Sequence, residues 1–414
     1  MSDSITRRTF LKGSVASAAF MAGLFTPFPF KQLNVSANSS DDPILVVVSL
    51  RGGWDALNVV APISGEDVGY YQKARPTLQI PQKELLPLET RFGVHPALKP
   101  LFELYQDQKM AVVHAVGLTY NTRSHFEAVE YMELGTPGEK TIHSGWLSRA
   151  WLADAFASEE GIPLVAIPSQ PTALQGSNQT ISLSSFNDLQ LWDGGMIDAQ
   201  IPVLRQLYAG ESNLAQSTNR TLDVLELVKS RVDQEYKPAG GVKYQDDEFS
   251  RNLQAVAQLI KMNTNLRYAT IDYGGWDTHE DQNYGTEGEM GILLSNLAAG
   301  LSSFYRDIER EHARRVTVVV MSEFGRRLAQ NESRGTDHGH GGVMLVLGGQ
   351  VLGGKVYGKW PGLANEQLFE RSDLAVTTDY RQVMSEILQK PMQIPNIIQV
   401  FPGFQMQGNL GLFG

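Results

Sequence analysis

The sequence predicts an α/β fold, a three-layer sandwich with a mostly parallel central sheet between two layers of helices. Several short apolar runs have the composition of buried strands, and long helical stretches separate most of them. Strands that alternate with helices form parallel sheets with helices on both faces. The composition agrees, because 42% hydrophobic and only 19% charged residues supply enough apolar surface for a large core.

The expected elements follow one another along the chain without an internal repeat. Strands are expected at residues 43–50, 110–116, 266–273, 316–322 and 343–347. Helices are expected over residues 95–106, 122–134, 200–236, 246–264 and 287–314. No segment has the composition of a linker, so we expect one domain over residues 38–414, with a polar insertion near 168–200.

Residues 1–37 have the pattern of an export signal. Arg7 and Arg8 form a twin-arginine pair, and an apolar stretch follows over residues 13–30. Residues 35–37 (Val-Ser-Ala) are the small residues that a signal peptidase requires before its cleavage site. The apolar stretch is too short and too mild for a membrane span, so we expect cleavage and no stable span afterwards. The twin-arginine translocase is then a partner during export to a periplasmic or secreted location, and an uncleaved N-terminal anchor is the alternative.

The charge balance and the lack of cysteine exclude several classes of protein. The chain has 45 acidic and 35 basic residues and a formal net charge of −10, which argues against a nucleic-acid partner that requires a basic face. Without cysteine there can be no disulfide, thiolate zinc site, iron–sulfur cluster or cysteine nucleophile. Any metal must therefore be bound by imidazole, carboxylate or hydroxyl groups.

Carboxylates and imidazoles gather where the predicted strands end or begin. The candidate metal ligands are Asp55, Asp277, His279, Glu323, Asp337, His338 and His340. Ligands of open parallel sheets bind beyond the carboxyl ends of the strands, so this pattern indicates a site for a hard or borderline metal. Two candidates have a structural alternative: Asp55 as the cap of a turn, and His279 as the cap of a helix.

A hydroxyl nucleophile is expected at the start of the predicted helix 122–134. Ser124 would lie among unpaired backbone N–H groups, where an anionic oxygen is favoured. Arg123 is then placed to hold phosphate or sulfate oxygens, and His125 to act as a metal ligand or a base. The alternative is a plain N-cap, because Ser124 and Glu127 have the spacing of a capping box.

Beyond the twin-arginine leader, five ordered motifs resemble a known family. They are LRGGWD at 50–55, RSHFEA at 123–128, GGWDTH at 274–279, SEFGR at 322–326 and GTDHGHGG at 335–342. Together they resemble an exported bacterial family known only as a domain of unknown function (domain of unknown function 1501), related to the sulfatase and alkaline-phosphatase superfamily. The resemblance covers nearly the whole mature chain and implies an alkaline-phosphatase-like fold.

The resemblance also implies a site with a metal-bound hydroxyl nucleophile and a two-metal cluster. It implies that Asp55 is the ligand after the first strand and Ser124 the nucleophile. Asp277 resembles the aspartate that opens the second metal site, and His338 or His340 the late histidine ligand. The sequence departs from the superfamily at Glu323-Phe324, which stands in place of an Asp-His pair, and at the spacing of Asp277 and His279, two apart instead of four. One or two divalent ions (zinc, manganese, magnesium or calcium) are therefore expected.

These residues and the resemblance together predict an exported, metal-dependent hydrolase of phosphate or sulfate esters that uses a serine nucleophile. The expected substrate is a small anionic ester or a sugar-linked one. Two alternatives stay open: a non-catalytic exported binding protein on the same scaffold, and a serine esterase that needs no metal.

Overall fold

The computed structural model describes residues 41–183, 196–231 and 236–414, which divide into two compact units. The larger unit holds 41–183 and 236–414, and the smaller one holds 196–231. The expected twin-arginine leader and its cleavage site lie outside the described residues, so export stays a prediction. Within the described residues, no helix has both the length and the apolar character needed to cross a membrane.

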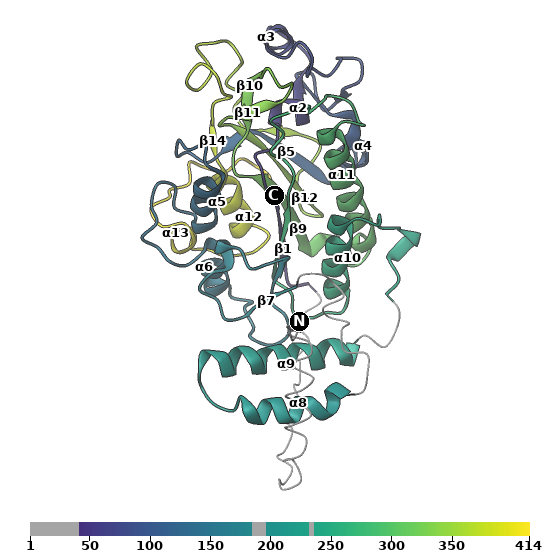
Figure 1. The fold of residues 1–414 in the computed structure, drawn as a ribbon, viewed down its shortest axis with the longest axis vertical. Helices are drawn as coiled ribbons and strands as arrows, with labels where there is room; N and C mark the ends of the chain where they lie inside the picture. The colour runs from purple at the N-terminus through teal and green to yellow at the C-terminus, as the bar shows by residue number, and fades with distance from the viewer. Residues whose placement is uncertain (1–40, 184–195, 232–235) are drawn as a thin grey trace, which may run out of the picture. The chain divides into compact units, whose positions relative to one another are not determined.

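A nine-stranded sheet lies at the centre of the larger unit (Figure 1). Its strands are β1 (Ile44–Leu50), β5 (Met110–Gly117), β6 (Leu164–Ile167), β7 (Thr180–Ser182), β8 (Tyr268–Tyr273), β9 (Val316–Ser322), β12 (Gly342–Gly348), β13 (Val356–Tyr357) and β14 (Thr378–Asp379). They pair in the order β13-β5-β12-β9-β1-β8-β6-β7, and β14 pairs with β5. Every pairing is parallel except those of β12 with β5 and with β9. The prediction of a mostly parallel sheet is confirmed.

The reversed strand β12 follows from the connection that precedes it. A parallel neighbour requires a long crossover, which is usually a helix. Between β9 and β12 the chain instead makes a small two-stranded sheet from β10 (Arg326–Gln330) and β11 (Thr336–His338). β12 therefore starts at the same sheet edge at which β9 ends, and the polar segments next to both strands meet there.

Helices cover both faces of the sheet, which confirms the three-layer prediction (Figure 1). One layer contains α4 (Lys99–Gln106), α10 (Glu248–Lys261) and α11 (Glu289–Ile308). The other contains α5 (His125–Leu134), α6 (Trp146–Ala153), α12 (Tyr380–Gln389) and α13 (Ile397–Val400). Residues of β1, β5 and β9 such as Val47, Val113 and Met321 form one apolar core with the second layer.

Short elements complete the larger unit. They are α2 (Ala56–Val59), α3 (Asp67–Ala74), the three-stranded sheet of β2 (Val60–Pro62), β4 (Phe92–Val94) and β3 (Leu86–Pro87), and 3₁₀ helices at Pro96–Leu98, Thr172–Leu174, Ala239–Gly241 and Ala313–Arg315. The polar insertion expected near 168–200 contributes β7, and its residues 184–195 lie outside the described residues.

The smaller unit consists of two helices, α8 (Met196–Leu207) and α9 (Asn213–Arg231). The prediction of one helix over 200–236 is therefore wrong. Gly210 adopts a φ of 140°, and the Ser212 hydroxyl accepts a hydrogen bond from the Ala215 amide and so starts a new helix. Arg205 of α8 pairs with Asp223 and Glu226 of α9.

Candidate metal centre

Two glycine turns place backbone from β1 and β8 side by side at one edge of the sheet. Trp54 and Trp276, one from each turn, are both buried and pack edge to face with their ring centroids 5.7 Å apart. Gly52 has a φ of 126°, and a Cβ atom added to it would lie 2.4 Å from the Asp277 backbone nitrogen. Only glycine permits this approach, which fixes the position of Asp277.

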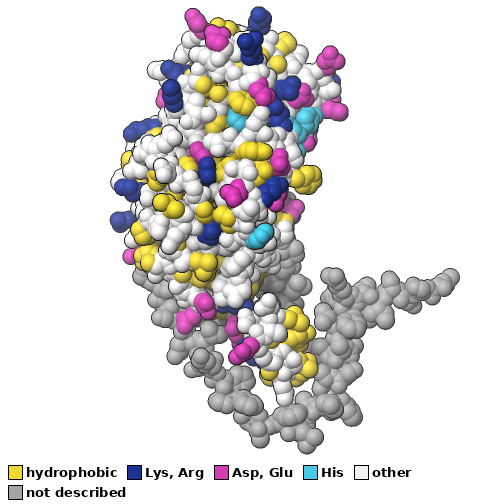
Figure 2. Space-filling model, turned by 90° about the vertical axis from the view of Figure 1, so that its left-hand side faces the viewer, with side chains coloured by type: hydrophobic (Ala, Val, Ile, Leu, Met, Phe, Trp, Pro, Cys, Tyr) yellow, Lys and Arg dark blue, Asp and Glu magenta, His cyan; other side chains and the backbone are white. Residues whose placement is uncertain are grey.

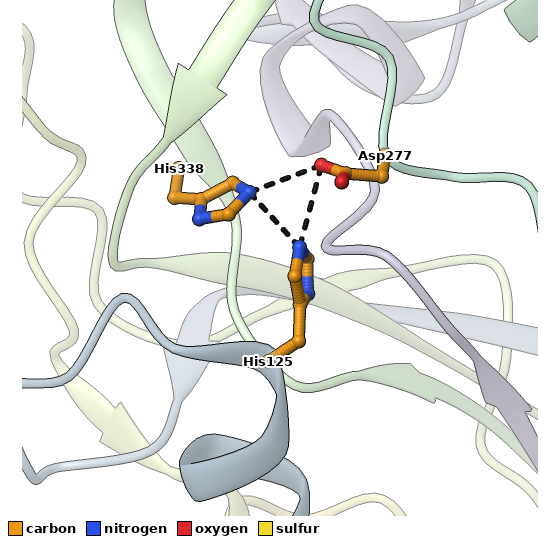
Figure 3. Close-up of side chains that lie close together, drawn as sticks. All are labelled: His125, Asp277 and His338. Atoms are coloured by element: carbon orange, nitrogen blue, oxygen red, sulfur yellow. Dashed lines mark hydrogen bonds and ion pairs between the residues drawn. The ribbon is translucent and has the colours of Figure 1, made fainter.

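Three candidate ligands from distant parts of the sequence converge at this edge (Figure 3). His125 is the first residue of α5, Asp277 follows β8, and His338 ends β11. The His338 Nε2 atom lies 2.9 Å from His125 Nε2 and 3.0 Å from Asp277 Oδ1, and the His125 Nε2 and Asp277 Oδ1 atoms are 3.3 Å apart. We call these three residues the metal-ligand cluster.

His279 adjoins the metal-ligand cluster. Its Nε2 atom lies 2.9 Å from His338 Nε2 and 3.1 Å from Asp277 Oδ1. The side chain is 39% exposed, so it lies on the open side of the site. The Nε2 atom of His338 and the Oδ1 atom of Asp277 thus lie close to the Nε2 atoms of both His125 and His279.

The second nitrogen of each ring determines what the Nε2 atoms can do. The Nδ1 atom of His125 lies 2.7 Å from Glu323 Oε1, and that of His338 lies 2.8 Å from the Arg123 carbonyl oxygen. The Nδ1 atom of His279 lies 3.3 Å from Asp337 Oδ1. Carbonyl and carboxylate oxygens only accept, so each Nδ1 carries the hydrogen and each neutral ring leaves a lone pair on Nε2. A group of facing acceptors is satisfied by a bound cation or by additional protons.

The carboxylates of the site are ionised and firmly held. Burial would raise the pKa of Asp277, but the hydrogen bond and positive charge of Arg326 outweigh it and help to lower that pKa to about 2. Burial likewise opposes ionisation of Glu323, and the hydrogen bond with His125 lowers the pKa of its carboxyl. That hydrogen bond in turn raises the pKa of His125. The fully buried Arg326 guanidinium lies 2.5 Å from Asp277 Oδ1 and also donates to the carbonyl oxygens of Gly52 and Gly53.

Asp55 does not join the metal-ligand cluster. Its side chain is buried, and its two oxygens lie 2.5 and 2.9 Å from the guanidinium of Arg75, which follows α3. Gln282 also donates to it at 2.7 Å. The guanidinium supplies the positive charge that the sequence-based interpretation assigned to a metal ion. Arg75 was not among the predicted site residues, and nothing in the spacing of the two residues indicates their pairing.

His340 also lies outside the metal-ligand cluster. Its buried ring stacks on Phe369 with centroids 4.2 Å apart, and burial lowers the pKa of the imidazole. One residue, Gly339, separates it from His338 along the chain, and its ring lies against the 369–373 segment instead. Of the two late histidines, the structure therefore brings only His338 to the site.

The predicted nucleophile and its arginine neighbour both have structural partners. Ser124 is the N-cap of α5, where its hydroxyl accepts from the Glu127 amide at 3.4 Å, and its side chain is exposed. Arg123 pairs with Glu370 at 2.7 Å and with Asp373, whose side chain is fully buried, at 2.6 Å. These ion pairs hold the loop in which the Arg123 carbonyl oxygen accepts the hydrogen bond from the His338 ring.

A cleft of about 700 Å³ opens beside the metal-ligand cluster. His125, Asp277 and Glu323 line it together with several residues between 126 and 143 and with Thr172 and Gln175. A volume of this size suits a small-molecule ligand. His143 also lies in this wall.

Comparison with known proteins gives a family and distant structural similarities. The family described as "Protein of unknown function (DUF1501)" matches residues 109–400. No curated protein matches the chain by sequence.

Three solved structures illustrate the similarities. Ps i-CgsB in complex with k-i-k-neocarrahexaose has a TM-score of 0.41 at 8% identity, covering 87% of this chain and 74% of that one. The zinc complex of the C-terminal periplasmic domain of EcEptC from Escherichia coli has a TM-score of 0.34 at 10% identity, covering 75% and 74%. Alkaline phosphatase from the Antarctic bacterium TAB5 has a TM-score of 0.28 at 8% identity, covering 74% and 92%.

Proposed function

The chain belongs to the DUF1501 family of proteins of unknown function, and we propose that it is an exported metal-dependent hydrolase of phosphate or sulfate esters. The observation that carries this proposal is the set of facing acceptor atoms, in which every ring hydrogen is already directed at an acceptor outside the cluster. Metal-binding histidines in proteins characteristically have their second nitrogen bonded in this way.

The donor set fits one borderline divalent ion. His125, His338 and Asp277 would hold it, and His279 is the further ligand available. Imidazole-rich sites favour zinc and neighbouring first-row metals over magnesium and calcium, which prefer oxygen ligands. With Asp55 neutralised by Arg75, the described residues offer one such group, so we propose one ion.

The reaction would depend on charge at the metal-ligand cluster and on groups placed around it. A cation bound there supplies Lewis acidity toward an ester oxygen and favours ionisation of a nearby hydroxyl. Ser124, exposed at the start of α5 and next to His125, is the proposed nucleophile. Its oxygen accepts from a backbone amide, so its own proton stays available for removal. His279, hydrogen-bonded to Asp337 and partly exposed, is placed to carry a proton.

The experiment is metal analysis of the exported protein followed by a screen of aryl phosphates and aryl sulfates. We expect about one bound ion per chain and turnover that a chelator abolishes, with both lost in His338→Ala. His340→Gln is the matched control because its ring lies outside the metal-ligand cluster. Absence of bound metal in the wild type, together with full activity in Ser124→Ala, would refute the proposal.

The same screen separates the alternatives. Turnover that persists in chelator indicates a metal-independent serine esterase, and metal binding without any turnover indicates a binding protein. Chelator-sensitive turnover that is unchanged in Ser124→Ala would assign the attack to water. Export is tested separately: Arg7→Lys with Arg8→Lys should leave the protein in the cytoplasmic fraction.

A further inference from the structure

Phe126 is an apolar side chain in an unusual position. It is the second residue of α5, directly after His125, and 90% of it is exposed, more than any other large hydrophobic side chain in the described residues. A single exposed apolar residue is ordinary on a protein surface. This one, however, lies in the wall of the cleft that leads to the metal-ligand cluster.

The rest of the cleft wall continues this apolar character. Val129, Leu134 and Ile142 line it together with Phe126. Polar groups that can donate or accept hydrogen bonds lie among them, in Thr172 and Gln175. Small-molecule sites typically combine apolar walls with a few such polar groups.

The cations in the cleft wall are already neutralised. Arg51 pairs with Glu133 at 2.5 Å and with Asp272 at 2.9 Å. Lys140 pairs with Glu130 at 2.6 Å. On the face of the molecule shown in Figure 2, acidic and basic side chains are interspersed and no large area of one charge stands out. A second anionic group on a substrate would therefore find no unpaired lysine or arginine in this wall.

We infer that the cleft binds the uncharged, ring-bearing part of the substrate, with one face of the ring against Phe126. This inference rests on the proposed ester hydrolysis and narrows its substrate class to monoesters of a ring-bearing alcohol. Water supplies one oxygen to the phosphate or sulfate, the ester bond to that group breaks, and the ring-bearing alcohol leaves with a proton. The anionic group lies at the metal-ligand cluster, and the ring extends toward Phe126, Val129 and Ile142.

The test is a binding measurement that does not require turnover. Zinc-loaded protein is titrated by calorimetry with methylphosphonate, phenylphosphonate and the non-hydrolysable phosphonate analogue of glucose 1-phosphate, so that the latter two distinguish an aryl ring from a sugar ring. An aromatic contact contributes about 0.5–1.5 kcal/mol, so at least one ring-bearing probe should bind roughly 2- to 10-fold more tightly than methylphosphonate. Phe126→Ala should abolish that preference and leave methylphosphonate binding unchanged.

Leu152→Ala is the matched control, since Leu152 is an exposed apolar residue of α6 at 77% exposure outside the cleft wall. It should keep the wild-type preference. Equal binding of all three probes, binding of none, or a Phe126→Ala variant that weakens methylphosphonate equally would overturn the inference. Failure of the proposed function is seen separately, as absent zinc or absent chelator-sensitive turnover in the wild type.

Discussion

Asp55 tests the assignment of the site most sharply, because the sequence and the structure give it different roles. Asp55→Asn keeps the size of the side chain and removes its charge. Arg75, with a side chain 0% exposed, would then be a buried cation without its counter-ion. Removing one partner of a buried ion pair costs about 3–5 kcal/mol.

The surroundings of Arg75 place the expected loss at the lower end of that range. Its guanidinium also donates to Asn58 Oδ1 at 2.7 Å and to the carbonyl oxygens of Leu328 and Arg327 at 2.8 and 2.9 Å. These acceptors remain in Asp55→Asn and continue to solvate the charge. We therefore expect the free energy of unfolding to fall by about 3 kcal/mol, a large fraction of ordinary domain stability.

The assay is urea unfolding in chelator at neutral pH, with zinc titration of the same protein preparations. Chelator is needed because bound metal would itself stabilise the fold. Asp55→Asn should lose stability and keep its affinity for zinc. The contrasting variant Asp277→Asn should lose zinc affinity tenfold or more. It also removes the counter-ion of a buried guanidinium, that of Arg326, so the zinc titration and not the stability distinguishes the two variants. An Asp55→Asn protein that is fully stable but no longer binds zinc would restore Asp55 as a ligand and refute the reasoning.

Three further predictions concern other parts of the molecule. Burial lowers the pKa of His114 to about 4 from 6.5, so the unfolded chain binds more protons than the folded one between about pH 6.5 and 4. The free energy of unfolding should therefore fall on acidification through that window by up to about 1.4 kcal/mol per pH unit. Urea unfolding at several pH values should show a weaker pH dependence of this free energy in His114→Gln, and an unchanged pH dependence would contradict the assignment to His114. Asp373→Asn should lower zinc affinity roughly 10- to 100-fold, because it releases the Arg123 loop whose carbonyl oxygen orients the His338 ring. Asp154→Asn, at another buried aspartate paired with arginine, should reduce stability alone. Equal zinc affinities of the two variants would contradict a positioning role for Asp373. Gly52→Ala should disrupt zinc binding, because the added Cβ meets the backbone of the turn that carries Asp277. Gly65→Ala, also at positive φ but with no atom within 4 Å of the added Cβ, should only strain its own loop. Zinc binding retained in Gly52→Ala would show that the two turns can move apart.

Much of the fold follows from local pattern. The buried, β-branched strand β1 and its neighbours β8 and β9 were predicted because a strand covered on both faces must be apolar along its whole length. The break between α8 and α9 was missed because a single glycine within a periodic stretch does not by itself end a helix. The antiparallel direction of β12 could not be predicted for another reason, because it depends on the path that the chain takes between β9 and β12.

The site could be predicted in part for the same reason. Asp277 follows an expected strand, so its place at the carboxyl edge of the sheet followed from the local pattern. His338 precedes a strand, and its place at the same edge depends on the reversed direction of β12, which the sequence did not reveal. His340 has almost the same sequence context as His338, and only packing against Phe369 separates them. Such packing depends on segments far apart in the sequence, which neither spacing nor composition reveals.

The reversed strand explains how one edge of the sheet can collect all of these groups. In an all-parallel sheet, residues that precede a strand lie at the opposite edge from residues that follow one. His338 precedes β12 and Asp277 follows β8, so a parallel β12 would have placed them at opposite ends of the sheet. The short β10–β11 hairpin brings the chain back at once, and β12 departs from the edge that β9 has just reached. A change of chain direction thus joins the two halves of the metal-ligand cluster, and lengthening this hairpin should impair metal binding before it impairs the sheet.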